Sequence, residues 1–165
     1  MGQGNIIGYE INEKTCQISF YNERQMEPET LEVDADNYQI PLIIGKLRDT
    51  WAYGKEAKRL VSIKEGYTVT RLLSRSLAGD KVELGEETYD AVWLLSRFIE
   101  MSLQSFPQID GIVFTVPSLT EELAHLLRAI AVRMKIDKRH IFIQDDQESL
   151  CIYMSYHSNT LWNIE

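Results

Sequence analysis

The chain has 165 residues, of which 44% are hydrophobic and 25% are charged; this is the composition of a folded domain and excludes a disordered, collagen-like or coiled-coil protein. Its formal net charge of -8 repels phosphate backbones and anionic lipid, so we expect no nucleic acid and no membrane among its partners. The two cysteines, Cys16 and Cys151, match no metal-binding spacing and no cleavable signal segment precedes the first strand, so we expect no metal site and a cytoplasmic location.

The first predicted element is a β-hairpin. Residues 6–11 and 15–21 are two strand-like runs, and residues 12–14 between them have the length of a hairpin turn. Asn12 suits the left-handed backbone conformation that such a turn can require. We therefore expect antiparallel strands at the start of the fold.

Two further strands are predicted after the hairpin. Residues 29–33 predict a strand whose Leu31 and Val33 side chains face inward. Residues 38–46 predict a fourth strand, and Pro41, which has no N–H group, excludes a central position in a sheet for that part of it.

The middle of the chain predicts two short helices and a long one. Residues 51–57 read as an extended segment that turns into a helix at Gly54, and residues 69–77 have the apolar spacing of a short amphipathic helix. From Tyr89 onward apolar residues recur at helical spacing, and Pro107 ends that helix.

The last part predicts one β-α-β-α unit. Residues 112–116 form an apolar run typical of a strand buried on both faces, and Ser118 with Glu121 forms a capping box at the start of a helix. A strand over residues 141–143 follows, and Asp145 or Asp146 caps a last helix. The buried stripes are expected at Leu123, Leu126, Leu127, Ile130 and Met134 in the first helix and at Leu150, Tyr153 and Met154 in the last.

This order of elements resembles the ribonuclease-H-like half of the actin, sugar-kinase and heat-shock-chaperone ATPases. Residues 8–15 lie where those chaperones carry Gly-Ile-Asp-Leu-Gly-Thr-Thr, their first phosphate loop. Pro41 and residues 53–58 resemble their Pro-Ser and Ile-Gly-Asp-Ala-Ala-Lys segments. Three later motifs correspond in the same order, at residues 68–75 (Thr-Val-Phe-Asp-Ala-Lys-Arg-Leu-Ile-Gly-Arg), 114–118 (Ile-Thr-Val-Pro-Ala) and 143–149 (Ile-Asn-Glu-Pro-Thr-Ala-Ala).

The resemblance implies an α/β fold, a ribonuclease-H-like mixed five-stranded sheet with flanking helices. Residues 1–165 would form a single actin-like lobe, with residues 46–85 as a small inserted subdomain. The chain would then be the N-terminal fragment of a two-lobed protein from a bacterial, chaperone-like branch, and its first partner would be the C-terminal lobe. A separate protein partner is the other partner that we expect.

The resemblance also names the candidate site residues. The candidates for contact with a nucleotide phosphate are Asn12, Glu13, Lys14 and Thr15, and the candidates for catalysis are Glu10 and Asp146. ATP and Mg²⁺ would be the cofactors of the full-length protein, and neither is expected to bind this fragment tightly.

Three residues depart from the chaperone pattern and argue against fast hydrolysis. Asn12 replaces a glycine, and Glu13 replaces a threonine and brings a carboxylate toward the phosphate, where like charges oppose binding. Lys14, or a magnesium ion, could offset that charge. Thr70 stands where the chaperones carry a catalytic lysine, so the fragment is expected to be inactive.

Simpler interpretations of the same residues remain open. Residues 12–14 are equally typical of a solvated hairpin turn, Asp145 and Asp146 of a helix cap, and Trp51, Trp93 and Trp162 of core packing.

Three functions follow from these interpretations. The first is a nucleotide-binding lobe that contacts ATP weakly, and the second is a degenerate lobe that serves as a protein-binding scaffold. The third is a nuclease, which needs carboxylates such as Glu10, Asp110 and Asp145 or Asp146 around two metal ions. Asp110 is expected to precede its strand, and the acidic surface opposes DNA, so the nuclease is the least favoured.

Overall fold

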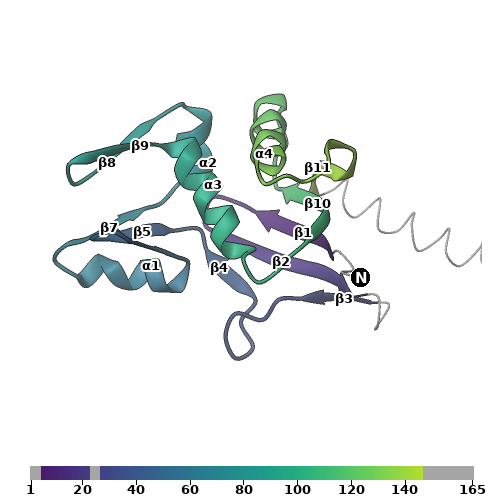
Figure 1. Ribbon diagram of the computed structural model, residues 1–165, viewed down its shortest axis with the longest axis horizontal. Coiled ribbons are helices and arrows are strands. Elements are labelled where there is room, and N and C mark those ends of the chain that lie inside the picture. The colour runs from purple at the N-terminus through teal and green to yellow at the C-terminus, as the bar shows by residue number, and fades with distance from the viewer. Residues whose placement is uncertain (1–4, 23–26, 147–165) are drawn as a thin grey trace, which may run out of the picture.

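A mixed sheet forms the centre of the protein (Figure 1). The structure is a computed structural model that describes residues 5–22 and 27–146. The strands of this main sheet are β1 (Asn5–Ile11), β2 (Thr15–Asn22), β3 (Glu27–Thr30), β4 (Gln39–Pro41), β10 (Ile109–Val116) and β11 (Ile141–Asp145). They lie in the order β11-β10-β1-β2-β3, and β4 pairs with β2 beside β3.

The pairing directions confirm the expected antiparallel start and parallel end. β2 is antiparallel to β1, β3 and β4, whereas β10 is parallel to both β1 and β11. The predicted hairpin is confirmed, and the protein has a mixed α/β fold in which helices cover a multi-stranded sheet. Within the described residues the main sheet has six strands where five were expected, because β3 and β4 share one edge of β2.

The single strand predicted over residues 38–46 is wrong. β4 ends at Pro41, and Ile43 N–H donates to the Pro41 carbonyl in a tight turn before β5 (Ile44–Leu47) begins in a different sheet. The inward position of Val33 is also wrong: the side chain is 40% exposed, because the chain leaves the main sheet after Thr30.

The second sheet has the order β6-β5-β7, with β6 at Thr50–Tyr53 and β7 at Gly66–Val69. The predicted turn into a helix is confirmed, since Gly54 has a φ of 64° and α1 (Lys55–Arg59) follows it, continuing into η1 (Leu60–Ser62). The helix predicted over residues 69–77 begins later than expected, because Val69 pairs with Ile44 of β5; α2 spans Leu72–Leu77.

The structure contains a small hairpin that the sequence analysis did not predict. β8 (Lys81–Leu84) and β9 (Glu87–Asp90) pair antiparallel around a turn at Gly85, which has a φ of 70°. Tyr89 therefore lies in a strand, and the long helix α3 spans Ala91–Ser102. The chain from Leu103 to Pro107 is non-helical, so the helix ends before the proline that was expected to end it.

The β-α-β unit is confirmed with corrected ends. β10 begins at Ile109, so Asp110 lies inside its strand rather than before it. α4 (Glu121–Arg133) is capped by Thr120, whose hydroxyl accepts from Leu123 N–H at 3.2 Å; the capping box expected at Ser118 lies too early in the chain. η2 (Lys138–His140) leads into β11, and the last predicted helix lies outside the described residues, as does Trp162.

The core lies between one face of the main sheet and helices α2, α3 and α4. Alternate residues of β1 point into it, namely Ile7, Tyr9 and Ile11, all fully buried. Strand β10 was expected to be buried on both faces, but its alternate residues, among them Thr115, are partly exposed. The sheet is therefore covered chiefly on the helical face, as far as the structure describes the chain.

Three hydrogen-bonded polar side chains lie within this core. Tyr9 Oη and Ser102 Oγ are 2.6 Å apart, and the Cys16 thiol donates to Tyr9 Oη at 3.6 Å. Burial raises the pKa of Cys16 to about 12 and raises that of Tyr9 as well. Both groups are therefore neutral and packed rather than reactive.

Candidate functional site

The turn predicted to hold phosphate is closed by its own side chain. Asn12 Oδ1 accepts hydrogen bonds from the N–H groups of Lys14, at 2.8 Å, and Thr15, at 2.9 Å. Asn12 does not take the left-handed conformation that its residue type suggested, because it forms this side-chain turn instead. Two of the amides that a phosphate would need are thus already bonded.

Glu13 points to a helix rather than to a ligand. Its carboxylate accepts from Ser74 N–H at 2.8 Å and from the Ser74 hydroxyl. Ser74 is the third residue of α2, and Arg71, which precedes that helix, makes no side-chain cap. Glu13 therefore caps α2 from 61 residues away and places a negative charge at the positive end of the helix.

The expected catalytic residues lie at the same end of the main sheet. Glu10 is exposed near the end of β1, where it pairs in register with Thr115 of β10, and Thr115 pairs with Gln144 of β11. Asp146 is exposed and directly follows β11. The parallel strands thus bring Glu10, Asp146 and the turn after β1 to one edge, the usual location of ligand sites in open α/β sheets.

The fold does not bring together Glu10 and Asp110, two of the carboxylates that a nuclease site would need. Asp110 lies at the start of β10 beside Asn5 and Ile6, whereas Glu10 pairs with Thr115. Five residues of strand separate these two levels by about 17 Å. Among the described residues no group of three or more histidine, cysteine or acidic side chains is placed to hold a metal ion.

The geometry does not fit a nucleotide phosphate in the turn after β1. A phosphate site offers free N–H groups in a concave backbone, and here Asn12 occupies two of them. Glu13 adds a carboxylate and Lys14 is the one cation in this turn, so the turn carries no net positive charge. Thr70, at the position of the chaperone lysine, is exposed between β7 and α2.

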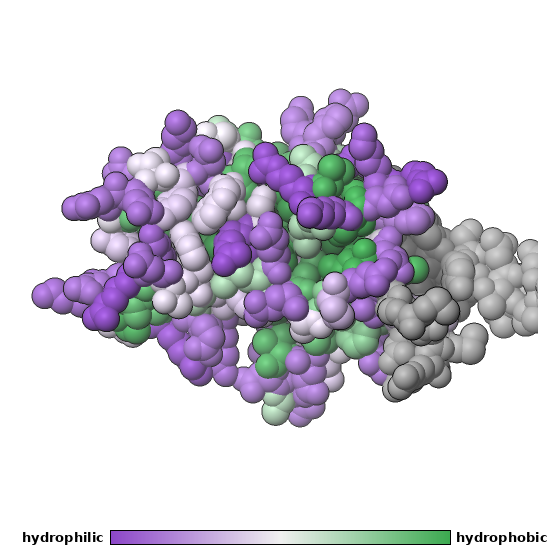
Figure 2. Space-filling model, viewed as in Figure 1, coloured by the Kyte–Doolittle hydropathy of each residue, from purple (hydrophilic) through white to green (hydrophobic). Residues whose placement is uncertain are grey.

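A surface groove along α3 was not expected from the sequence. We call it the α3 groove; it consists of three adjoining depressions that share Glu100. The middle one has a volume of about 330 Å³ and is lined by Trp51, Trp93, Ser96, Arg97, Glu100 and Arg133. On the face seen in Figure 2, hydrophobic residues reach the surface right of centre, among hydrophilic side chains.

The two outer depressions extend the groove in opposite directions. One, of about 900 Å³, continues from Trp51 and Arg97 past β6 toward Asp34 and Asp49. The other, of about 490 Å³, lies between the ends of α3 and α4 and shares Glu100 and Arg133 with the middle one.

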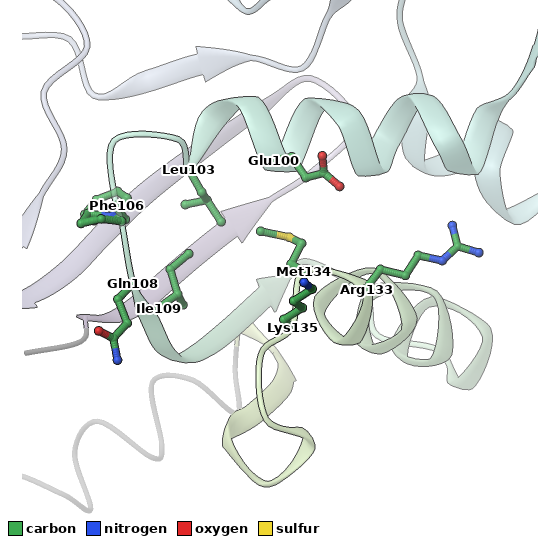
Figure 3. A pocket seen from close by; sticks show the side chains of 9 residues that line it. Glu100, Leu103, Phe106, Gln108, Ile109, Arg133, Met134 and Lys135 are labelled. Carbon is green, nitrogen blue, oxygen red and sulfur yellow. The ribbon is translucent and has the colours of Figure 1, made fainter. Parts of the chain in front are cut away.

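Apolar side chains line the depression between α3 and α4. In Figure 3, Leu103 and Met134 point toward each other across it, and Glu100 and Arg133 lie at the end opposite Phe106. Leu103 is 2% exposed, so this depression has an apolar base and a charged end.

Trp51 and Trp93 line the groove beside β6, and Tyr89 packs against both of their rings. The ring centroids of Trp93 and Tyr89 are 5.2 Å apart and stacked, and those of Trp93 and Trp51 are 5.4 Å apart. Lys46 Nζ lies 5.2 Å from the Tyr89 centroid and donates to Tyr89 Oη at 2.8 Å, which raises the pKa of Lys46. The Tyr89 hydroxyl in turn donates to Glu87 and lowers the pKa of that carboxyl.

Trp93 is only partly a packing residue, since its side chain is 40% exposed. The sequence did contain a signal for the groove: Trp93, Arg97 and Glu100 follow one another at helical spacing on the side of α3 opposite its buried stripe. A tryptophan on the polar side of an amphipathic helix is a candidate contact residue.

None of the helices that the structure describes could span a bilayer.

Comparison with known proteins places the chain in a family. No curated protein matches the sequence. A family model described as "Family of unknown function (DUF5716) C-terminal" matches residues 27–165, and the chain belongs to this family.

Proposed function

We propose that the chain is a ribonuclease-H-like, actin-related lobe that has lost its phosphate site and serves as a non-catalytic, protein-binding module. The fold part of this proposal is supported by the hairpin β1–β2 and by the parallel strands β10 and β11, which join the sheet on the other side of β1. β10 follows helix α3 and β11 follows helix α4, as in the lobe that the motifs resemble.

One observation carries the loss of function, namely the capping of α2 by Glu13. A residue that must hold the start of a helix is not available to a nucleotide, and its carboxylate would repel a phosphate brought to the same turn. Because phosphoryl transfer depends on positive charge placed at the transferred group, this turn opposes hydrolysis.

Weak nucleotide contact is the second candidate function. It is favoured by the row of polar side chains formed by Glu10, Thr115 and Gln144 at the carboxyl ends of the parallel strands. In this form of the proposal the full-length protein would bind ATP and Mg²⁺ between this lobe and a second lobe, and Asp146 would face the same edge.

A nucleotide titration distinguishes the two candidates. The full-length protein is titrated with ATP and Mg²⁺ by isothermal calorimetry, and phosphate release is followed in a parallel assay. We expect neither binding heat nor phosphate release. Binding without release would favour the second candidate, and steady phosphate release would refute the non-catalytic module.

A further inference from the structure

We infer that the part of the α3 groove between Trp93 and Lys135 binds an acidic peptide segment of a partner protein, one with an aromatic or large aliphatic anchor side chain. The inference rests on the proposed protein-binding function and deepens it by naming the surface and the chemistry of the partner. It follows from four properties of the groove.

The first property is the local charge. The middle depression and the one beside the end of α4 are lined by Arg97, Arg133, Lys135 and Glu100 as their charged residues. Three cations and one anion give a local charge of +2 on a chain whose formal net charge is -8. A basic site on an acidic protein attracts an acidic segment of a partner.

The second property is a weakly paired arginine. Arg97 Nη1 lies 3.8 Å from the Glu100 carboxylate, and both side chains are about half exposed. Arg97 Nε is buried, without a hydrogen-bond partner among the described residues, so a partner reaches the exposed end of the guanidinium instead. A weak surface ion pair of this kind is readily exchanged, so a carboxylate from a partner can replace Glu100 and accept hydrogen bonds from the Nη groups of Arg97.

The third property is the presence of anchor sites. Trp51 and Trp93, whose ring centroids are 5.4 Å apart, line the middle depression together with Arg97, and the next depression has an apolar base at Leu103 and Met134. Tryptophan and arginine together are the residue types that most often dominate binding energy in protein interfaces. An extended peptide can therefore place one apolar side chain in the groove and carboxylates beside it.

The fourth property is the direction of the groove. The depression beside β6 carries four acidic residues, among them Asp34, Asp49 and Glu56, against two cations. An acidic peptide is repelled there and is directed instead along α3 toward the end of α4. The partner segment is therefore predicted to lie from Trp93 to Lys135 and not across β6.

A peptide selection tests the inference. A random twelve-residue library displayed on phage is panned against the immobilised chain, and the enriched peptides are synthesised and measured by fluorescence anisotropy. We expect enrichment of peptides with acidic residues around an aromatic or leucine anchor. Their affinity should fall at least about fivefold in Arg97→Glu and in Arg133→Glu, and it should weaken as salt is raised.

Matched variants keep the test specific. Lys64 is exposed and lies outside the α3 groove, so Lys64→Glu makes the same charge change elsewhere and should leave the affinity unchanged. Trp93→Ala should lose about tenfold, and Trp93→Leu, which retains apolar surface, should lose less. Circular dichroism melting curves establish that each variant is folded.

The possible outcomes separate the inference from the proposed function. If the enriched peptides bind equally well after both arginine reversals, the inference that they bind in the α3 groove is refuted. The proposal of a protein-binding module is then unaffected. If no acidic peptide is enriched, the inference that the groove binds an acidic peptide is also refuted. The nucleotide titration tests the proposed function independently. A twenty-residue oligothymidine that binds the chain and is released by Arg97→Glu would overturn the inference in favour of single-stranded nucleic acid.

Discussion

The carboxylate of Glu13, in the turn between β1 and β2, accepts hydrogen bonds from the N–H group and the hydroxyl of Ser74 in α2. This contact joins the first hairpin of the chain to a helix 61 residues later. Asn12 closes the same turn, because its Oδ1 accepts from Lys14 N–H and Thr15 N–H.

Removing the Glu13 carboxylate is predicted to destabilise the fold. Glu13→Ala should lower the free energy of unfolding by about 1–2 kcal/mol, because it deletes a helix cap with a charged acceptor. Ser74→Ala should lower it less, since the Ser74 N–H group can still donate to Glu13. Urea titrations measure both. Lys14→Ala, at an exposed neighbour, is the control and should stay within about 0.5 kcal/mol; equal effects of Glu13→Ala and Lys14→Ala would contradict the cap.

Placing small residues in the turn is predicted to give it anion binding. Asn12→Gly frees the N–H groups of Lys14 and Thr15, and Glu13→Thr removes the opposing charge. The double variant should bind pyrophosphate at least about tenfold more tightly than the parent chain in calorimetric titrations, a gain of about 1.4 kcal/mol. Glu13→Gln alone removes the charge and leaves the amides occupied, so it should gain less. A double variant that is folded but gains nothing would show that this turn is not related to a phosphate loop.

The start of α4 gives a direct comparison of two possible caps. Thr120→Ala should destabilise the protein by about 1 kcal/mol, because the Thr120 hydroxyl accepts from Leu123 N–H. Ser118→Ala should be close to neutral, since Ser118 precedes the cap by two residues. Thermal unfolding of the two variants, each compared with the parent, decides between them. A larger loss for Ser118→Ala would restore the capping box that the sequence suggested.

The buried thiol predicts a loss of stability at alkaline pH. Burial raises the pKa of Cys16 from its ordinary value of 9.0 to about 12, so the folded chain retains a proton that the unfolded chain releases. The stabilisation is complete below pH 9 and is lost as the pH rises from 9 toward 12, at up to about 1.4 kcal/mol per pH unit for one proton. The raised pKa of Tyr9 acts in the same direction.

A cysteine variant isolates the thiol. Urea unfolding of Cys16→Ala between pH 8 and 10.5 should show a shallower decline than the parent chain, because Tyr9 remains in both proteins and only the thiol is removed. Identical slopes in the two proteins would mean that the thiol is not protected from ionisation by the fold.

The local parts of the fold were predictable from residue patterns. The strand-like run of β1 and the helical spacing in α3 and α4 were sufficient to place these elements, since each buries one side against the same core. Their ends were less predictable. Val69 has the spacing of a helical residue, but it pairs with Ile44, and that contact overrides the local pattern.

The site was predictable only where the interaction is local. The hairpin turn at residues 12–14 is a property of a few consecutive residues and was one of the two interpretations that the sequence left open, although the side-chain turn of Asn12 was not predicted. The partner of Glu13 lies in another element, so no pattern within the turn could identify it. The exposure of Trp93 likewise depends on how β6 and β9 pack beside α3, which sequence spacing does not give.

The second sheet begins and ends at paired residues. Ile44 opens β5, Val69 closes β7, and the two are partners in the ladder, so the chain enters and leaves the second sheet at points one strand spacing apart, about 5 Å. A longer excursion could therefore be inserted between Ile44 and Val69 without moving β4 or α2, whereas Ile44 and Val69 themselves belong to the buried core and must be kept. Variation in size among relatives of this chain is predicted to concentrate at this junction.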